Sequence, residues 1–330
     1  MKQFLQKKAK LVFLCMLVLL TCTACANPRG RDGKTLADQI IASEETTIDA
    51  SKINYKDISD KKLKKEIKKN IKDGQYTIQP TTFKNSMSKG WFEGLIVWPI
   101  AQIINLISSK TDAGVGIILT TLLIQMLVFV FTRKSQMSTQ RMQEIQPEIQ
   151  KIQNKYKDKT DERSKMQMAQ EMQNIYQKYD IHPFGSMLIT FIQLPIMMGM
   201  YYATMRSVSV VSGSFMGISL AGTPLDGFKA FDIAYISIYV LMVIFYIVSM
   251  KIPQWLKKWQ DKKDNVKVKK YAQEQTNPMA NSMNMSMYFM TAMICIMYIS
   301  WPMAMSFYWL VSSVIRVCQS LILHKVMNKK

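Results

Sequence analysis

Long apolar stretches separated by polar and charged connections dominate this chain after residue 110. Five of them are long enough for a helix to cross the roughly 30 Å hydrocarbon core of a bilayer. The five stretches are residues 114–132, 184–206, 232–250, 284–300 and 304–323. The pattern therefore predicts an all-α membrane protein with five transmembrane helices.

A sixth apolar stretch, at residues 91–110, is interrupted by Glu93, Pro99, Gln102 and Asn105. If this stretch crossed the bilayer, the chain would have to turn back almost at once to enter the next span. An amphipathic helix that lies in the membrane interface needs no such return. We therefore predict an interfacial helix here, and a sixth span is the less economical alternative.

Two apolar seams follow each other between the first two spans. The first seam has a 3-4-3-4 spacing, at Met142, Ile145, Ile149, Ile152 and Tyr156. The second repeats it after a polar break, at Met168, Met172, Ile175 and Tyr179. Such spacing predicts two helices that pair as an antiparallel hairpin within residues 133–183. Pro147 either kinks the first helix or marks its first turn. A hairpin that packs only on itself and a docking site for a partner both fit this pattern.

The charge of the connections alternates along the chain. Residues 133–182 carry ten Lys and Arg, residues 251–282 carry eight, and the last seven residues carry three. The two connections on the opposite side carry fewer basic residues: residues 207–231 contain one lysine, Lys229, and residues 301–303 contain no Lys or Arg. Because short basic loops stay in the cytoplasm, we predict that the hairpin, the loop 251–283 and the basic tail 324–330 are cytoplasmic. The loop 207–231 and the N-terminus then lie outside.

The chain has a formal charge of +20 although 48% of its residues are hydrophobic. The basic residues are spread over all polar segments without an aromatic–basic motif, which argues against a nucleic-acid substrate. Ribosomal RNA remains open as a docking surface for the cytoplasmic loops and tail. The sequence has no phosphate-binding glycine loop, metal cluster or nucleophile constellation. We therefore expect no cofactor.

The N-terminus resembles a bacterial lipoprotein signal peptide at residues 1–24. Lysines precede the apolar stretch 11–20, which is too short to span a membrane. Small residues stand directly before Cys25, so we expect Cys25 to receive a diacylglycerol and to become the new N-terminus. Cys22 is the poorer candidate because Leu20 and Thr21 precede it, and an uncleaved anchor is the weaker alternative.

The segment 25–90 is polar and rich in lysine. It contains one candidate amphipathic helix, in which Leu63, Ile67 and Ile71 share a face. The remainder shows no regular pattern. We therefore expect a loosely ordered extracytoplasmic segment, whose function the sequence does not reveal.

Arg316 stands in the middle of the last apolar stretch. A charge near the bilayer centre costs from a few to more than ten kcal/mol, so it usually faces a bundle interior or a wet cavity. The alternative is that Arg316 snorkels to the nearer interface. Arg206 ends the second span on the outer side, and there snorkelling is the expected arrangement.

The hairpin and the spans around it resemble the YidC family of membrane protein insertases. The resemblance covers about residues 91–326, and its motifs occur in the family's order. They are Met142–Gln153, Lys155–Lys157, Tyr179–Gly185, Gln193–Ile196, Tyr201–Arg206, Phe307–Ser313 and Gln319. The lipoprotein-type signal is similar to that of Gram-positive members.

This resemblance implies five helices around a hydrophilic groove that is open to the cytoplasm and to lipid. The implied activity is to accept hydrophobic segments of nascent membrane proteins and to release them sideways into the lipid bilayer. It acts alone or beside the Sec translocon, and the basic loops and tail are candidates for ribosome contact. No bond is made or broken, and no nucleotide is needed.

One departure from the family changes the expected site. The family's groove arginine belongs at the end of a Leu-Leu-Ile-Arg-like run, and here the run reads Leu122-Leu123-Ile124-Gln125. Gln125 and Arg316 lie at nearly equal depth in two helices that run in the same direction. We hypothesise that the positive charge of the groove has moved to Arg316. The alternative is that Arg316 snorkels while Gln125 only hydrates the groove.

Other polar and aromatic residues within the spans have two interpretations. Four polar residues could either line the groove or join helices by hydrogen bonds. They are Gln193, Ser312, Ser313 and Gln319. Tyr308 and Trp309 match the family but are also ordinary interfacial residues. Abundant methionine suits variable apolar clients, although sequence drift explains much of it as well.

Two other classes of function compete with insertion. A transporter should show inverted repeats or broken helices with mid-membrane acidic residues, and the sequence shows neither. A scaffold for a membrane complex should tolerate the substitution Arg316→Ala, and an insertase that depends on this charge should not.

Overall fold

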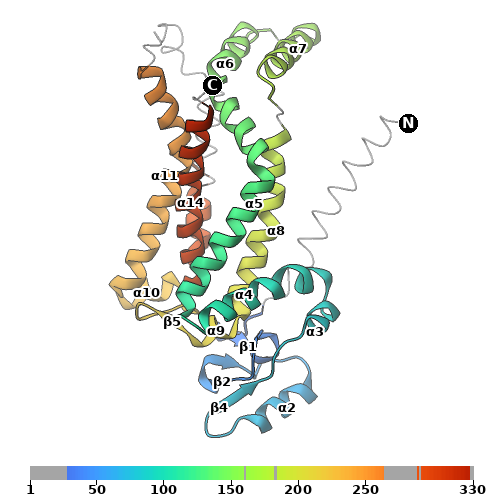
Figure 1. Ribbon diagram of the computed structural model, residues 1–330, viewed down its shortest axis with the longest axis vertical. Coiled ribbons are helices and arrows are strands. Elements are labelled where there is room, and N and C mark those ends of the chain that lie inside the picture. Colours follow the sequence, from blue (N-terminus) through green and yellow to red (C-terminus); the bar gives the residue numbers. More distant parts are fainter. Residues whose placement is uncertain (1–27, 160, 182–183, 264–287, 290, 328–330) are drawn as a thin grey trace, which may run out of the picture. The chain divides into compact units, whose positions relative to one another are not determined.

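The computed structural model describes residues 28–327 apart from residues 160, 182–183, 264–287 and 290 (Figure 1). The expected signal peptide and the lipidation of Cys25 lie outside these residues. The described chain forms two compact units. The first unit runs up to Thr120 and includes Leu194–Gly222, and the second combines Thr121–Gln193 with the chain from Thr223 onward.

The first unit begins with short strands and helices. Strand β1 (Thr35–Leu36) pairs in parallel with β3 (Ile53–Asn54), and β2 (Thr46–Asp49) pairs antiparallel with β4 (Gln75–Ile78). Single 3-10 turns, η1 (Ala37–Gln39) and η2 (Ala50–Lys52), stand between these strands. Helix α2 (Lys61–Asn70) starts at Asp60, whose carboxylate accepts two backbone N–H groups, and α3 (Phe83–Ser88) starts at Thr82.

The expectation of a loosely ordered segment at 25–90 is wrong, because residues 28–90 have a hydrophobic core. Isoleucines from the strands and from α2 meet there, together with two valines that follow α8. The members are Ala37, Ile40, Ala42, Ile48, Ile53, Ile58, Ile67, Ile78, Val208 and Val211. Only Ile48, Ile53 and Ile78 of this core lie on strands, and those strands are two to four residues long. Such short strands give too few repeats for alternation to be recognised.

The stretch predicted to lie in the membrane interface is helical. A π-helical turn, η3 (Glu93–Val97), leads into α4 (Trp98–Ser108). One face of this helix is buried, as Ile100, Ala101 and Ile104 show. The opposite face exposes large apolar side chains, with Leu95 56% and Leu106 59% exposed. An exposed apolar face of this kind is typical of a helix in contact with lipid.

Apolar helices form most of the rest of the chain: α5 (Ala113–Glu144), α8 (Phe184–Arg206), α11 (Ile233–Lys263) and α14 (Met303–Met327). Among the described residues, three stretches are long and apolar enough to cross a membrane, Ala113–Met142, Ile233–Gln260 and Met303–Val326. The predicted span 184–206 coincides with α8. The predicted span 284–300 falls partly outside the described residues, and its residues 291–298 are helical.

Helix α11 packs along α14 in the second unit (Figure 1). The described residues of the predicted fourth span join them, since the hydroxyl of Tyr239 donates to the carbonyl oxygen of Cys295 at 2.6 Å. A short helix, α10 (Pro224–Ala230), precedes α11 and is capped reciprocally by Thr223 and Asp226. In the first unit α8 is followed by α9 (Val208–Ser212) and by the hairpin of β5 (Ser214–Phe215) and β6 (Ile218–Ser219).

Helices α6 (Gln146–Lys155) and α7 (Glu162–Lys178) form the helical hairpin (Figure 1). As the spacing predicts, the seam residues Ile145 and Ile149 are buried and pack with Met172 and Ile175. Pro147 lies in the first turn of α6, where its missing N–H has no consequence.

The two hairpin helices are also joined by charged groups. The Lys155 ammonium lies 2.5 Å from a Glu171 carboxylate oxygen, which also accepts the hydroxyl of Tyr156 at 2.9 Å. The hydrogen bond from Lys155 lowers the pKa of Glu171, and the same bond raises the pKa of Lys155. This pair closes the end of the hairpin near the turn.

Candidate functional site

Polar side chains from three apolar helices meet in the second unit. Gln125 of α5 is only 5% exposed, and its amide nitrogen lies 3.3 Å from the Ser312 hydroxyl of α14. Ser312 and Ser313 are fully buried. An amide buried among apolar side chains needs such a partner, because an unpaired amide in this setting costs a few kcal/mol. The contact therefore fixes α5 against α14 at this depth.

Tyr308 is the centre of this group. It is fully buried, and its hydroxyl is 3.2 Å from the amide nitrogen of Gln193 on α8. The other polar groups that act on the Tyr308 hydroxyl are those of Gln125, Ser312 and Arg316. We call these five residues the Tyr308 cluster. Gln125, at the family's arginine position, contacts Ser312, and Arg316 contacts the neighbouring Ser313.

Arg316 is held by aromatic rings and by a serine. Its guanidinium donates to the Ser313 hydroxyl at 2.8 Å. The guanidinium carbon lies 5.7 Å from the ring centre of Trp309 and 5.8 Å from that of Tyr246. Faces of aromatic rings attract cations. Among the described residues, no carboxylate forms an ion pair with Arg316.

The aromatic side chains beside Arg316 contact one another. Trp309 stacks on Tyr298 with ring centres 4.9 Å apart and an interplanar angle of 27°, and it meets Tyr246 edge-on at 6.2 Å. The indole N–H of Trp309 is buried and has no hydrogen-bond partner among the described residues. Sequence reasoning missed Tyr246 and Tyr298. Tyrosines in otherwise apolar spans are the signal that could have indicated them.

Gln319 follows Arg316 by about one turn of α14 and is half-buried. Among the described residues it forms no hydrogen bond with the Tyr308 cluster. The remaining predicted site residues, Gln125, Gln193, Tyr308, Trp309, Ser313 and Arg316, lie in or beside the cluster. Their position is compatible with either lining a groove or joining helices, the two alternatives that the sequence left open.

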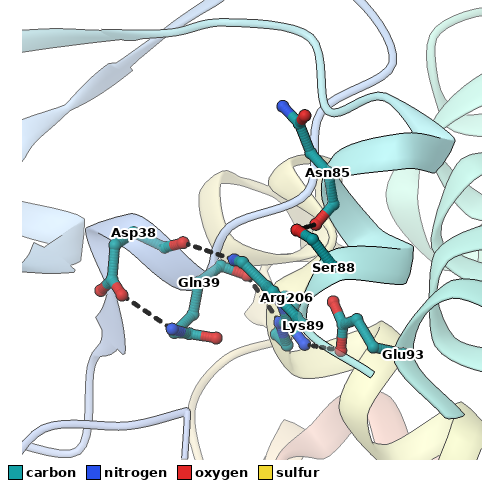
Figure 2. Close-up of polar contacts among 7 residues, drawn as sticks. All are labelled: Asp38, Gln39, Asn85, Ser88, Lys89, Glu93 and Arg206. Carbon is teal, nitrogen blue, oxygen red and sulfur yellow. Dashed lines mark hydrogen bonds and ion pairs between the residues drawn. The ribbon is translucent and has the colours of Figure 1, made fainter. Parts of the chain in front are cut away.

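Arg206 does not snorkel, contrary to the sequence interpretation. It lies in the first unit, is 4% exposed, and pairs with the Glu93 carboxylate (Figure 2). Its Nε also donates to the carbonyl oxygen of Gln39 at 2.6 Å. The expectation failed because the pairing residue precedes Arg206 by 113 positions. Hydropathy along one helix cannot reveal such a partner.

The surroundings of Arg206 are polar as well. We call Arg206 and its polar neighbours Asp38, Gln39, Lys89 and Glu93 the Arg206 junction. Lys89 donates to the Asp38 carbonyl oxygen at 3.1 Å, and the Gln39 amide donates to the Asp38 carboxylate at 2.7 Å (Figure 2). The junction therefore ties three segments that are distant in sequence: the turn η1, the start of η3 and the end of α8.

Comparison with known proteins identifies the family. The family model described as 60Kd inner membrane protein matches residues 105–330. Membrane protein insertase YidC 1 of Streptococcus pyogenes serotype M6 is 31% identical over 237 residues, which are 72% of this chain and 75% of the relative. Membrane protein insertase MisCA of Bacillus subtilis (strain 168) is 27% identical over 238 residues, which are 72% of this chain and 80% of the relative.

A solved structure of an active YidC insertase is also similar, with a TM-score of 0.47 and 17% identity. The match covers 75% of this chain and 57% of that chain. The resemblance drawn from the motifs is confirmed by the family model and by the curated relatives. This chain therefore belongs to the 60Kd inner membrane protein family, the family of the YidC insertases, and is a multi-pass membrane protein.

Proposed function

We propose that this insertase takes hydrophobic segments of nascent membrane proteins into a hydrophilic groove and releases them sideways into the lipid bilayer. The observation that carries the proposal is the Tyr308 cluster, a group of polar side chains buried among apolar helices. Insertion makes and breaks no covalent bond, so the chain is not an enzyme. The work consists of lowering the barrier for polar parts of a client.

Two physical effects act on such a client. A hydrated groove shortens the apolar distance that a polar segment must cross, because water then replaces lipid along part of the path. A cation in the groove also attracts an acidic client segment, and the attraction is strong where the surroundings screen it poorly. The attraction has to stay weak enough for the client to leave.

Arg316 is the residue that we propose for this cation. Gln125, at the family's arginine position, can donate a hydrogen bond but carries no charge. Gln125 and Arg316 contact consecutive serines of α14, Ser312 and Ser313. Aromatic faces and a serine hold its guanidinium without neutralising it, so its charge stays available to a client carboxylate. The groove charge has moved from α5 to α14.

We also propose how the chain lies in the membrane. The N-terminus, lipidated at Cys25, and residues 28–90 lie outside, and the hairpin, the loop 251–283 and the tail lie in the cytoplasm, because these carry the basic residues. The exposed apolar face of α4 rests in the outer interface. The Sec translocon and the ribosome are the partners that this arrangement admits, the ribosome through the basic cytoplasmic segments.

The test is growth of bacteria that are depleted of their own insertase and that express this chain at matched levels. Insertion of a client with an acidic extracytoplasmic segment is measured beside a client whose segment is neutral. Arg316→Ala should lose the acidic client, whereas Val314→Ala, at an exposed position of the same helix, should not. Failure of the intact chain to rescue growth would contradict the insertase proposal. Equal insertion of both clients by Arg316→Ala would remove Arg316 from the mechanism.

A further inference from the structure

Helix α2 presents a dense array of positive charge. Its ten residues, Lys61–Asn70, contain six lysines and one glutamate. Ile67 is buried and Leu63 packs on the core, so the helix turns its two apolar residues inward. Five lysines are exposed on the other faces: Lys61, Lys62, Lys65, Lys68 and Lys69. Among the described residues, none of these five forms an ion pair.

This arrangement works against the helix that carries it. Like charges three or four residues apart destabilise a helix by about 0.2–0.5 kcal/mol per pair, and the pairs Lys61–Lys65 and Lys65–Lys69 have this spacing. Lys61 and Lys62 also stand in the first turn, where the helix dipole disfavours a cation. The fold needs only polar residues at these positions. A lysine at each of them indicates a function for the charge itself.

A cavity of about 380 Å³ begins where α2 ends, at Ile71. Its lining includes two lysines, two aspartates and a tyrosine, namely Lys34, Lys56, Asp32, Asp49 and Tyr55. Both carboxylates already accept hydrogen bonds from backbone N–H groups, Asp32 at 3.0 Å and Asp49 at 2.7 Å. We call the exposed lysines of α2, together with this cavity beyond the end of the helix, the α2 surface. It offers several ammonium groups beside a polar hollow.

The α2 surface faces away from α4. Within the first unit, α2 and α4 lie at opposite ends with β4 between them (Figure 1). If the apolar face of α4 rests on the membrane, the lysines of α2 do not reach the headgroups of that membrane. A partner with many negative charges must then come from outside the bilayer.

We infer that the α2 surface binds a phosphate-bearing anionic polymer on the extracytoplasmic side. The lysines repeat along the helix axis at about 6 Å for every four residues, so they can contact successive phosphates of one chain. This inference rests on the extracytoplasmic placement of residues 28–90 under the proposed function.

The test uses the full chain in nanodiscs of phosphatidylcholine, with labelled inorganic polyphosphate as the probe. In one variant the five exposed lysines of α2 become glutamine. A matched control changes five exposed lysines of the hairpin instead: Lys151, Lys157, Lys159, Lys165 and Lys178. A third variant replaces the α2 lysines by arginine, which keeps the charge. Binding is measured over a range of salt concentrations, and vesicles of phosphatidylglycerol form a second arm.

The intact chain, the hairpin variant and the arginine variant should bind polyphosphate. The glutamine variant of α2 should bind at least about tenfold more weakly, with a salt slope smaller by about 3, since each neutralised phosphate of a single strand contributes about 0.7 to the slope. Unchanged binding by this variant would overturn the inference. So would binding to phosphatidylglycerol vesicles without binding to polyphosphate, because the partner would then be a lipid surface. Rescue of growth by the same variant shows whether insertion, a separate activity, is intact.

Discussion

Arg206 is buried and Arg316 is half-buried, and the surroundings of these two arginines differ. Arg206, in the first unit, is paired with a carboxylate and donates to a carbonyl oxygen (Figure 2). Arg316, in the second unit, has two aromatic faces and one serine hydroxyl, and among the described residues it has no carboxylate. The first charge is neutralised within the fold. The second remains available to a ligand from outside the chain.

This difference separates a structural charge from a functional one. A buried ion pair such as Arg206 with Glu93 resists separation, because breaking it leaves a desolvated charge. A cation held on aromatic faces keeps its full charge, since the ring quadrupole attracts it without titrating. The surroundings distinguish Arg316, which we propose for client contact, from Arg206, whose charge is paired within the fold.

The largest expected effect comes from breaking the Arg206 junction. Glu93→Gln leaves the Arg206 guanidinium without a counter-charge and should lower the free energy of unfolding by about 3–5 kcal/mol. Denaturant titration of the protein in nanodiscs measures this loss. Ser88→Ala, beside the junction, is the control and should change the free energy by less than about 0.5 kcal/mol. A loss of under about 1 kcal/mol for Glu93→Gln would show that the pair is dispensable.

Arg316→Ala should have a small effect on stability and a large effect on insertion. Because no carboxylate is left unpaired, its stability should fall much less than that of Glu93→Gln. Insertion of an acidic client should fall about tenfold, equivalent to a lost interaction of about 1.4 kcal/mol. Protease protection of the inserted client measures this step. If Arg316→Ala lowered the free energy of unfolding as much as Glu93→Gln does and left insertion unchanged, the comparison between the two arginines would be contradicted.

A charge exchange sharpens the hypothesis of relocation. Arg316→Gln combined with Gln125→Arg returns the cation to α5 and should restore insertion of the acidic client to at least about half, because the two positions contact consecutive serines of α14. The same client and the same protease assay apply. No recovery in the double variant, with both single variants folded, would show that the position of the charge matters more than its presence.

Tyr308→Phe should have a smaller effect. It removes the hydroxyl that accepts from Gln193 and leaves that amide without this partner, at a cost of about 1–3 kcal/mol in unfolding free energy. Denaturant titration in nanodiscs measures it, and Tyr288→Phe, at an exposed tyrosine, is the control. An unchanged free energy would mean that Gln193 finds water or another acceptor at once.

The smallest effect concerns the hairpin, whose charges are exposed. Because Lys155 lowers the pKa of Glu171, this pair contributes stability above the ordinary glutamate pKa of 4.5. The contribution is lost as the pH falls through the lowered value of the folded state. Amide hydrogen exchange in α6 and α7 at pH 6 and pH 3 should show less protection at pH 3. Glu171→Gln should abolish this change, and a pH effect that persisted in it would assign the effect to other groups.

Periodicity and hydropathy predicted the apolar helices and the hairpin seam, because both depend on neighbours three or four residues apart. Alternating loop charge and the family's motifs supplied an orientation and a candidate site. Local patterns could not supply pairs made across long separations. Glu93 and Arg206 form one such pair. The isoleucine core of residues 28–90 also depends on contacts between residues far apart in the sequence. The rings of Tyr246 and Tyr298 also required three-dimensional packing to be seen beside Arg316.

Helix α5 continues without a break from its apolar part to Glu144, 32 residues in all. From Gln125 to the start of the hairpin it spans about 28 Å at 1.5 Å per residue. A helix of this length resists twisting because each turn is locked by backbone hydrogen bonds. One uninterrupted stretch of helix therefore joins the hairpin to the Gln125–Ser312 contact, and the length of this stretch fixes how far the hairpin lies from that contact along the helix.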